Sequence, residues 1–175
     1  MSAVPRLVVL AVTTMTLASC TREVPWTVAT VDVPGLRAAL EGQRGKPILL
    51  ATFATWDSDS VEALARVGKA GASLRDAGGR IVFLCVDRMA NSPLESVTAA
   101  VKKLAESKTL AGEILVWSGN DAAELDGALP LEDGEKASAK LPMAFGYSKD
   151  GALAGTLSKE LDDAALSELV AKIRG

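Results

Sequence analysis

Two carboxylates and two hydroxyls stand together at positions 57–60, where residue type and spacing could support chemistry. Asp57-Ser58-Asp59-Ser60 come soon after the apolar run Pro47–Leu50, and a helical pattern begins directly after them. Two aspartates separated by one residue could bind a divalent cation and act as nucleophile and general acid or base. The same residue types also favour a helix N-terminus, where their oxygens accept hydrogen bonds from free backbone N–H groups. We expect the helix cap.

The residue types that are missing narrow the chemistry further. The chain has no histidine, which excludes Ser-His-Asp triads, Cys-His dyads and histidine-ligated zinc or copper. It has two cysteines, Cys20 at the end of an N-terminal apolar segment and Cys85 inside the apolar run Arg80–Asp87. A cysteine in a buried strand usually acts as a small, unreactive hydrophobic side chain. We therefore expect no intrachain disulfide, no metal site, no cofactor and no catalytic residue.

The first nineteen residues have the features of a bacterial targeting segment. Arg6 is their only charge, Leu7–Leu17 is largely apolar, and Leu17-Ala18-Ser19-Cys20 resembles the lipobox that precedes an acylated cysteine. The apolar stretch is too short to predict a membrane-spanning helix, and an ordinary secretory signal cleaved near Cys20 is the alternative. We expect a lipoprotein signal peptide over 1–19, a tether over 20–25 and one domain over 26–175, anchored to the membrane by acyl chains on Cys20.

Charge excludes some partners and the lipobox suggests a location. The formal net charge is −3 and the basic residues form no cluster, so we expect neither nucleic acid nor anionic lipid headgroups as ligands. Acylation of Cys20 predicts a place in the bacterial cell envelope, facing the periplasm. Because Thr21 rather than an aspartate follows Cys20, the resemblance to well-studied lipoproteins favours the outer membrane over the inner.

Apolar periodicity and turn signals predict strands that alternate with helices. Strands are expected at 26–31, 48–55, 80–87 and 113–117, and a hairpin at 141–147 and 152–157 with Asp150-Gly151 at its turn. Early alternation implies parallel crossovers, and the hairpin adds antiparallel strands. The sequence therefore predicts an α/β fold with a mixed central sheet and helices on both faces.

The expected helices cover residues 34–45, 57–77 and 120–127, a segment that begins near 92, and a last one from 162. The start near 92 has the strongest signal, with Ser92 as N-cap, Pro93 at the first helical position and Glu95 in a capping box. On the helix over 57–77, five small or apolar residues form the expected buried face: Val61, Leu64, Ala65, Gly68 and Ala72. Residues 130–140 are polar and are expected to form a loop.

Two stretches near the start of the domain resemble the active-site region of the thioredoxin-like family, in particular its membrane-tethered periplasmic thiol-disulfide oxidoreductases. They are Lys46-Pro47 and Phe53-Ala54-Thr55-Trp56. In that family Lys-Pro, an apolar strand and Phe-Trp-Ala-Thr-Trp precede Cys-x-x-Cys. Here Asp57 and Ser60 stand at the positions of the two cysteines. The resemblance implies a three-layer α/β/α sandwich with a C-terminal β-hairpin and helix.

A later segment resembles the same family. Leu141-Pro142-Met143-Ala144-Phe145 precedes Lys149-Asp150-Gly151, in the order in which the family places an apolar residue, a cis-proline, a short strand and a turn. The resemblance implies that Pro142 is cis and faces the redox position across the sheet edge. A trans proline that opens a strand is the alternative. Met143 departs from the threonine that often follows this proline.

The replaced cysteines decide the functional prediction. Disulfide exchange needs a thiolate at the helix start and a second thiol to resolve the mixed disulfide, and neither Asp57 nor Ser60 can supply one. We expect a lipid-anchored envelope domain without redox activity, not an enzyme, which binds an envelope protein or peptide through the surface around Trp56, Asp57, Ser60 and Pro142. A purely structural subunit of an envelope complex is a further possibility, because fold analogy cannot separate the two.

The rival interpretation is a magnesium-dependent phosphohydrolase. An apolar strand followed by Asp-x-Asp-x-Val resembles the first motif of haloacid-dehalogenase-like enzymes, with Asp57 as nucleophile and Asp59 as general acid/base. Ile114–Ser118 resembles their second motif, and Lys140 and Asp162-Asp163 could complete the site. However, Asp162-Asp163 follow no apolar strand, and the helix after Asp59 leaves no room for that family's flap. A calcium loop is weaker still, because the Gly and Glu that it requires are missing.

Overall fold

The computed structural model describes residues 26–41, 45–129, 131, 136–159 and 161–175. The strands are β1 (Thr27–Val31), β2 (Ile48–Phe53), β3 (Arg80–Cys85), β4 (Glu113–Trp117), β5 (Met143–Tyr147) and β6 (Leu153–Ser158). The helices are α1 (Val33–Glu41), α2 (Ser58–Asp76), α3 (Leu94–Lys108), α4 (Ala122–Ala128) and α5 (Asp163–Arg174), with short 3₁₀ helices η1 (Asp87–Ala90) and η3 (Ala137–Ala139).

The predicted signal peptide over 1–19, the acylation site Cys20 and the tether over 20–25 lie outside the described residues. Within the described part of the chain, no helix has the length and apolar character needed to cross a bilayer.

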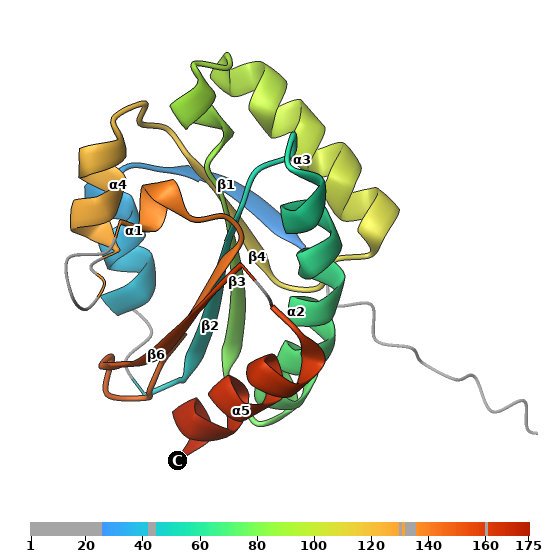
Figure 1. The fold of residues 1–175 in the computed structure, drawn as a ribbon, viewed down its shortest axis with the longest axis vertical. Coiled ribbons are helices and arrows are strands. Elements are labelled where there is room, and N and C mark those ends of the chain that lie inside the picture. Colours follow the sequence, from blue (N-terminus) through green and yellow to red (C-terminus); the bar gives the residue numbers. More distant parts are fainter. Residues whose placement is uncertain (1–25, 42–44, 130, 132–135, 160) are drawn as a thin grey trace, which may run out of the picture.

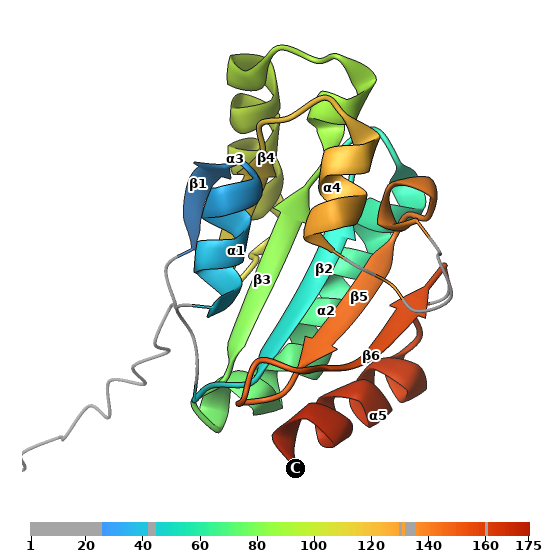
Figure 2. The same cartoon turned by 90° about the vertical axis from the view of Figure 1, so that its left-hand side faces the viewer.

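The strands form one six-stranded mixed sheet in the order β1-β4-β3-β2-β5-β6. The pairs β1/β4, β4/β3 and β3/β2 are parallel, whereas β2/β5 and β5/β6 are antiparallel. Figure 2 shows β5 and β6 leading directly into α5 at one side of this sheet. The predicted α/β class, the mixed sheet and the C-terminal hairpin plus helix are confirmed.

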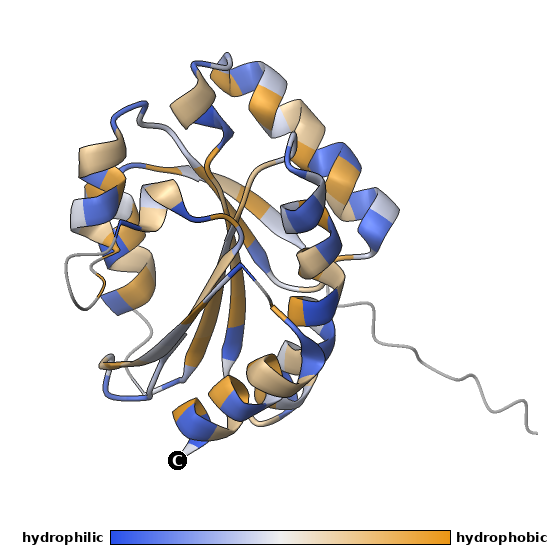
Figure 3. Ribbon diagram, viewed as in Figure 1, coloured by the Kyte–Doolittle hydropathy of each residue, from blue (hydrophilic) through white to orange (hydrophobic). Residues whose placement is uncertain are grey.

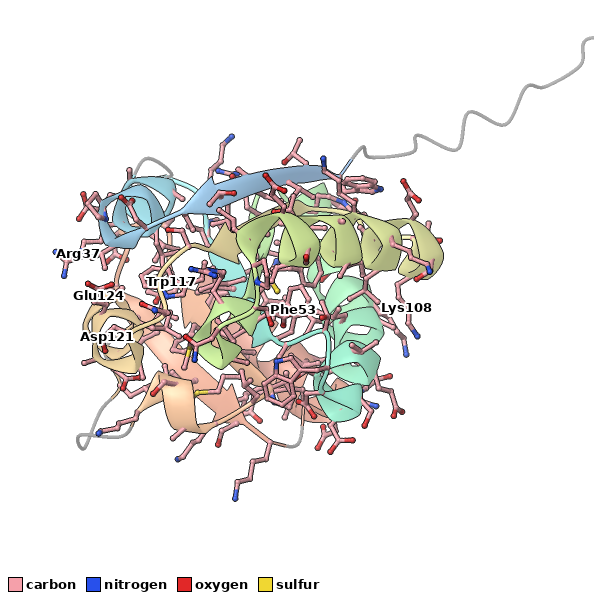
Figure 4. All side chains as sticks on the ribbon, turned by 90° about the horizontal axis from the view of Figure 1, so that it is seen from above. Arg37, Phe53, Lys108, Trp117, Asp121 and Glu124 are labelled. Carbon is pink, nitrogen blue, oxygen red and sulfur yellow. The ribbon has the colours of Figure 1, made fainter. Side chains whose placement is uncertain are left out.

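Helices cover both faces of the sheet and enclose two apolar cores. In Figure 1, α1 and α4 lie on one side and α2, α3 and α5 on the other, and Figure 3 shows apolar residues concentrated on the strands between them. The larger core contains Phe53 and Phe83, and the smaller contains Trp117 and Phe145, all fully buried. Figure 4 shows Phe53 and Trp117 in the interior of the molecule. The predicted three-layer sandwich is therefore present.

The start of α3 differs from its prediction. Its N-cap is Pro93, with ψ 135°, and no side chain caps it. The carbonyl of Pro93 accepts a hydrogen bond from Val97 N at 3.0 Å, so the helix begins one residue later than the Ser92 signal suggested. The backbone carbonyl of Ser92 instead accepts a hydrogen bond from the Arg88 guanidinium. The capping-box prediction was wrong because extended backbone at Pro93 moves Ser92 out of capping range.

Two other helices also differ in detail. The helix predicted over 34–45 is described over Val33–Glu41, residues 42–44 lie outside the described part of the chain, and Gly45 is in a turn. On α2 the buried face is rotated from the predicted one and consists of Ser60, Ala63, Leu64, Val67, Gly71 and Leu74. Of the five predicted face residues only Leu64 is fully buried. The rotation follows from Ser60, a polar residue that the apolar pattern ignored and that is buried through its hydrogen bonds to Asp57.

Candidate functional site

Asp57 and Ser60, which stand where the resemblance expects cysteines, are bonded directly to each other. Asp57 is the N-cap of α2, with extended backbone at φ −98° and ψ 110°. Its carboxylate accepts hydrogen bonds from Ser60 N, at 3.2 Å, and from the Ser60 hydroxyl. Ser60 is fully buried. The Asp57 carboxylate thus satisfies a backbone donor that the helix leaves unpaired, and it also satisfies a buried hydroxyl.

The predicted capping function of this segment is confirmed, and Asp57 is the residue whose side chain bonds the helix start. Asp59 and Glu62 also have capping-box spacing but do not form a capping box. Glu62 instead forms an i,i+4 ion pair with Arg66, at 3.2 Å. The helix begins at Ser58, so Asp59 already lies in its first turn.

A buried carboxylate from the neighbouring strand holds the loop before α2. Asp87 follows β3 and is only 4% exposed. Its Oδ1 accepts from Thr55 N at 2.7 Å and its Oδ2 from the Thr55 hydroxyl. The backbone next to Trp56 is therefore fixed by two hydrogen bonds to an ionisable group. Sequence reasoning placed Asp87 in a strand and missed this role, although a polar residue that closes an apolar parallel strand was a usable signal.

Trp56 projects from this fixed loop. It is 64% exposed, and it is the only large hydrophobic side chain with such exposure in the described part of the chain. The other two tryptophans are packing residues, since Trp117 is fully buried and Trp26 is partly buried against the larger core. Large apolar side chains are usually covered, so an isolated exposed tryptophan beside a rigid loop marks a candidate contact surface.

Pro142 lies at the neighbouring strand end. The Leu141–Pro142 peptide bond is cis, as the sequence analysis predicted. Thr52 pairs with Met143 across β2 and β5, and Met143 N donates to Thr52 Oγ1 at 3.3 Å. Continuing this register by one residue places Pro142 beside Phe53, next to the loop that leads to Trp56. Pro142 itself is buried, so it supports the surface around Trp56 and adds little exposed area to it.

Comparison with solved structures identifies the fold of this chain. Neither a protein-family model nor a curated protein matches the sequence. A thiol:disulfide interchange protein of the thioredoxin family from Chlorobium tepidum superposes with a TM-score of 0.58 at 18% identity, covering 82% of this chain and 90% of that one. An uncharacterized thioredoxin-like protein from Porphyromonas gingivalis gives 0.54 at 20% identity, covering 74% and 76%. StoA from Bacillus subtilis gives 0.51 at 13% identity, covering 72% and 83%.

This chain has the thioredoxin-like fold. The similarity spans most of the described domain and most of each structure it resembles. At these identities it shows the architecture alone, so the chemistry of the site has to be read from the residues of this chain.

The thioredoxin-like scaffold presents no reactive thiol near the start of α2 among the residues that the structure describes. Cys85 is fully buried at the end of β3, as predicted. Burial, with a further contribution from the charge of Asp87, raises the pKa of the Cys85 thiol far above its usual range. A neutral, buried thiol neither attacks disulfides nor binds metal well. The side chains at the helix start can accept hydrogen bonds and bear charge, and they cannot exchange disulfides.

The phosphohydrolase alternative finds no support in the geometry. Asp57 is engaged by Ser60, Asp162 caps α5 by accepting from Ala165 N at 2.8 Å, and Asp163 pairs with Lys69. Among the described residues, no group of three acidic or cysteine side chains is arranged to hold a metal ion. Three of the four carboxylates that the alternative requires, those of Asp57, Asp162 and Asp163, are thus committed to helix caps and an ion pair.

Proposed function

We propose that this protein is a lipid-anchored thioredoxin-like module of the bacterial cell envelope, which binds another envelope protein and performs no disulfide exchange. The observation that supports this proposal is the Asp57–Ser60 pair. It occupies the helix start with hydrogen bonds where the resemblance expects two thiols. The exposed Trp56 beside it remains available for contact.

The local structure favours binding over a purely structural role. Aromatic side chains on rigid backbone dominate the binding energy of many interfaces, because they lose little conformational entropy when they are covered. Trp56 has this setting, since the adjoining Thr55 is bonded through both its N–H and its hydroxyl to Asp87. A fold that served only as a scaffold would have no need to hold an exposed tryptophan in this way.

Photocrosslinking in cells tests the proposed contact surface. A photoreactive amino acid at Ser58, which is exposed next to Trp56, should form a discrete adduct with a partner, and Trp56→Ala should abolish that adduct. The same amino acid at Lys108, an exposed position at the end of α3 at the periphery in Figure 4, is the matched control. Equal adducts from both positions, or an adduct at Ser58 that survives Trp56→Ala, would count against this surface.

Two simpler assays test the remaining parts of the proposal. In an insulin-reduction assay with dithiothreitol the protein should show no turnover above the reagent alone, and clear turnover would refute the redox-inactive assignment. Metabolic labelling with radioactive palmitate should label the wild type and leave Cys20→Ala unlabelled. A secreted, unlabelled wild type would show instead that residues 1–19 act as an ordinary signal, and membrane fractionation would distinguish the outer from the inner membrane.

A further inference from the structure

A groove lies directly beside the start of α2, between its first turns and the connection from β6 to α5. Its volume is about 630 Å³, within the range of ligand-binding clefts. In Figure 1 the chain between β6 and α5 runs alongside α2. Figure 2 shows β5, β6 and α5 together at one edge of the sheet. Seven charged side chains line the groove: Asp59, Glu62, Arg66, Lys69, Lys159, Asp162 and Asp163.

Most of these side chains already have partners, and Asp162 is one of them, since it caps α5. Arg66 contacts Glu62 at 3.2 Å, and its Nε donates to the carbonyl of Leu161 at 2.9 Å. Lys69 forms an ion pair with Asp163. The two walls are therefore connected by side chains of α2 that reach residues at the start of α5.

Two opposite charges are left over, one on each wall. The carboxylate of Asp59, on α2, and the ammonium of Lys159, after β6, make no hydrogen bond or ion pair with any other residue that the structure describes. The backbone of Lys159 is nevertheless fixed: it is left-handed, at φ 66°, and its N–H donates to the carbonyl of Pro142 at 3.1 Å. The groove thus offers a cation on a fixed backbone and an anion, neither of them paired within the described part of the chain, to a molecule that enters it.

The groove lies near the surface around Trp56. Asp59 follows Trp56 by three residues in the chain, and the backbone N–H of Lys159 donates to the carbonyl of Pro142. An occupant that covers Trp56 and extends into the groove would reach Asp59 first. An open groove that carries separated charges of both signs suits an extended polypeptide better than a compact, uniformly charged ligand.

We propose that this groove receives an extended segment of the partner protein, with a basic side chain against Asp59 and an acidic side chain against Lys159. The inference rests on the proposed binding function and specifies the chemistry of the partner. Trp56 supplies most of the contact area, and the two charges fix the direction in which the segment lies. Since both charges are exposed, they contribute specificity and rate of association more than affinity.

Selection of linear twelve-residue peptides displayed on phage, with the purified full chain as bait, tests this proposal. Selected sequences should share a basic and an acidic residue at a constant separation. Synthetic copies should bind Asp59→Lys and Lys159→Glu about three- to tenfold more weakly than wild type, because each reversal replaces attraction with repulsion. A peptide with its two charges exchanged should recover binding to the double variant Asp59→Lys/Lys159→Glu. Binding should also weaken with added salt.

Matched controls separate a groove effect from a general charge effect. Asp76→Lys, at the other end of α2, and Lys108→Glu, at the end of α3, make the same charge changes at exposed positions outside the groove and should leave binding unchanged. Failure to enrich any peptide, or equal binding to the reversal variants and the controls, would overturn the groove assignment. If Trp56→Ala abolishes binding while the reversals do not, docking at Trp56 stands and only the groove inference fails.

Discussion

A helix that begins at Ser58 leaves its first backbone N–H groups without partners, and Asp57 supplies an acceptor for one of them. The same carboxylate accepts from the buried hydroxyl of Ser60. In a thiol-disulfide site the helix start stabilises a thiolate, whereas here its free N–H groups meet a carboxylate that already has its partners. At the scale of single residues, the start of α2 has an acidic cap and no thiol.

Truncation of the cap should therefore destabilise the domain. Asp57→Ala removes the acceptor for Ser60 N and leaves the Ser60 hydroxyl buried without it, so the free energy of unfolding should fall by about 1–2 kcal/mol. The measurement is urea unfolding followed by circular dichroism. Asp59→Ala, which changes an exposed carboxylate in the same turn, should stay within about 0.5 kcal/mol of wild type. Equal effects of the two substitutions would contradict the assignment of Asp57 as the cap.

Restoring the thiols should restore redox chemistry. In the double variant Asp57→Cys/Ser60→Cys, the first cysteine occupies the N-cap and the second lies three residues later, in the arrangement that lowers a thiol pKa and resolves mixed disulfides. We expect insulin reduction well above the reagent background, and a pKa below about 8.5 for the thiol introduced at the N-cap. Asp57→Cys alone lacks the resolving thiol and should not turn over. An inactive double variant that forms its disulfide would show that more than the cysteines has been lost.

The sequence contained a signal for Asp87, at the end of an apolar strand, but it did not reveal the partner of Asp87. Its partner Thr55 lies 32 positions earlier, and their contact depends on the adjacency of β2 and β3, which only the sheet order establishes. The capping role of the 57–60 segment could be predicted because capping is local, acting within about four residues.

At the scale of elements, strands were easier to predict than helix faces. Strands β2 and β3 are buried along nearly their whole length, so an apolar run sufficed to locate them. The face of α2 that the sequence predicted to be buried is offset by one residue from the observed face, because the observed face includes a polar residue, Ser60. On α5, by contrast, the buried residues are all apolar: Leu166, Leu169, Val170 and Ile173.

Alanine substitutions at two glycines of α2 test which face of the helix is buried, because they should change the free energy of unfolding in opposite directions. A Cβ on Gly71 would lie 2.5 Å from Cδ1 and 2.6 Å from Cγ1 of Ile81, whereas a Cβ on Gly68 would meet nothing within 4 Å. Gly68→Ala should raise the free energy of unfolding by about 0.5–1 kcal/mol through helix propensity. Gly71→Ala should lower it by about 1–3 kcal/mol through overpacking. Thermal or urea unfolding measures both changes. If Gly71→Ala stabilised the domain and Gly68→Ala destabilised it, the buried face would be the one predicted from the sequence.

At the scale of the whole molecule, alternation of strands and helices predicted the three layers, and two short motifs predicted how the ends of β2 and β5 meet. The groove between α2 and the β6–α5 connection was not predicted, because its lining comes from segments almost a hundred residues apart. Its charges look like ordinary solvated helix surface in the sequence. Only the packing of α5 against α2 brings them together.

The buried thiol gives the whole domain a distinctive alkaline response. In the folded protein, burial keeps Cys85 protonated well above its usual range, while in the unfolded chain the thiol loses its proton near a pH of about 8.5. The unfolded state therefore binds fewer protons above that pH, and the free energy of unfolding should fall with rising pH, by about 2 kcal/mol at about pH 10. Below about pH 8 this group should have no effect. Burial raises the pKa of Tyr147 to about 12, so its contribution begins only above about pH 10.

Cys85→Ala isolates this contribution, since all other groups titrate alike in the two proteins. The variant should be less stable at neutral pH because it loses buried volume, but the difference between the proteins should shrink as the pH rises from about 8 to about 10. Urea unfolding at each pH gives the free energies, and alkylation by iodoacetamide gives an independent reading, because the thiol should react only after unfolding. A constant difference across this range, together with rapid alkylation of the folded protein, would mean that Cys85 is accessible and ionises freely in the native state.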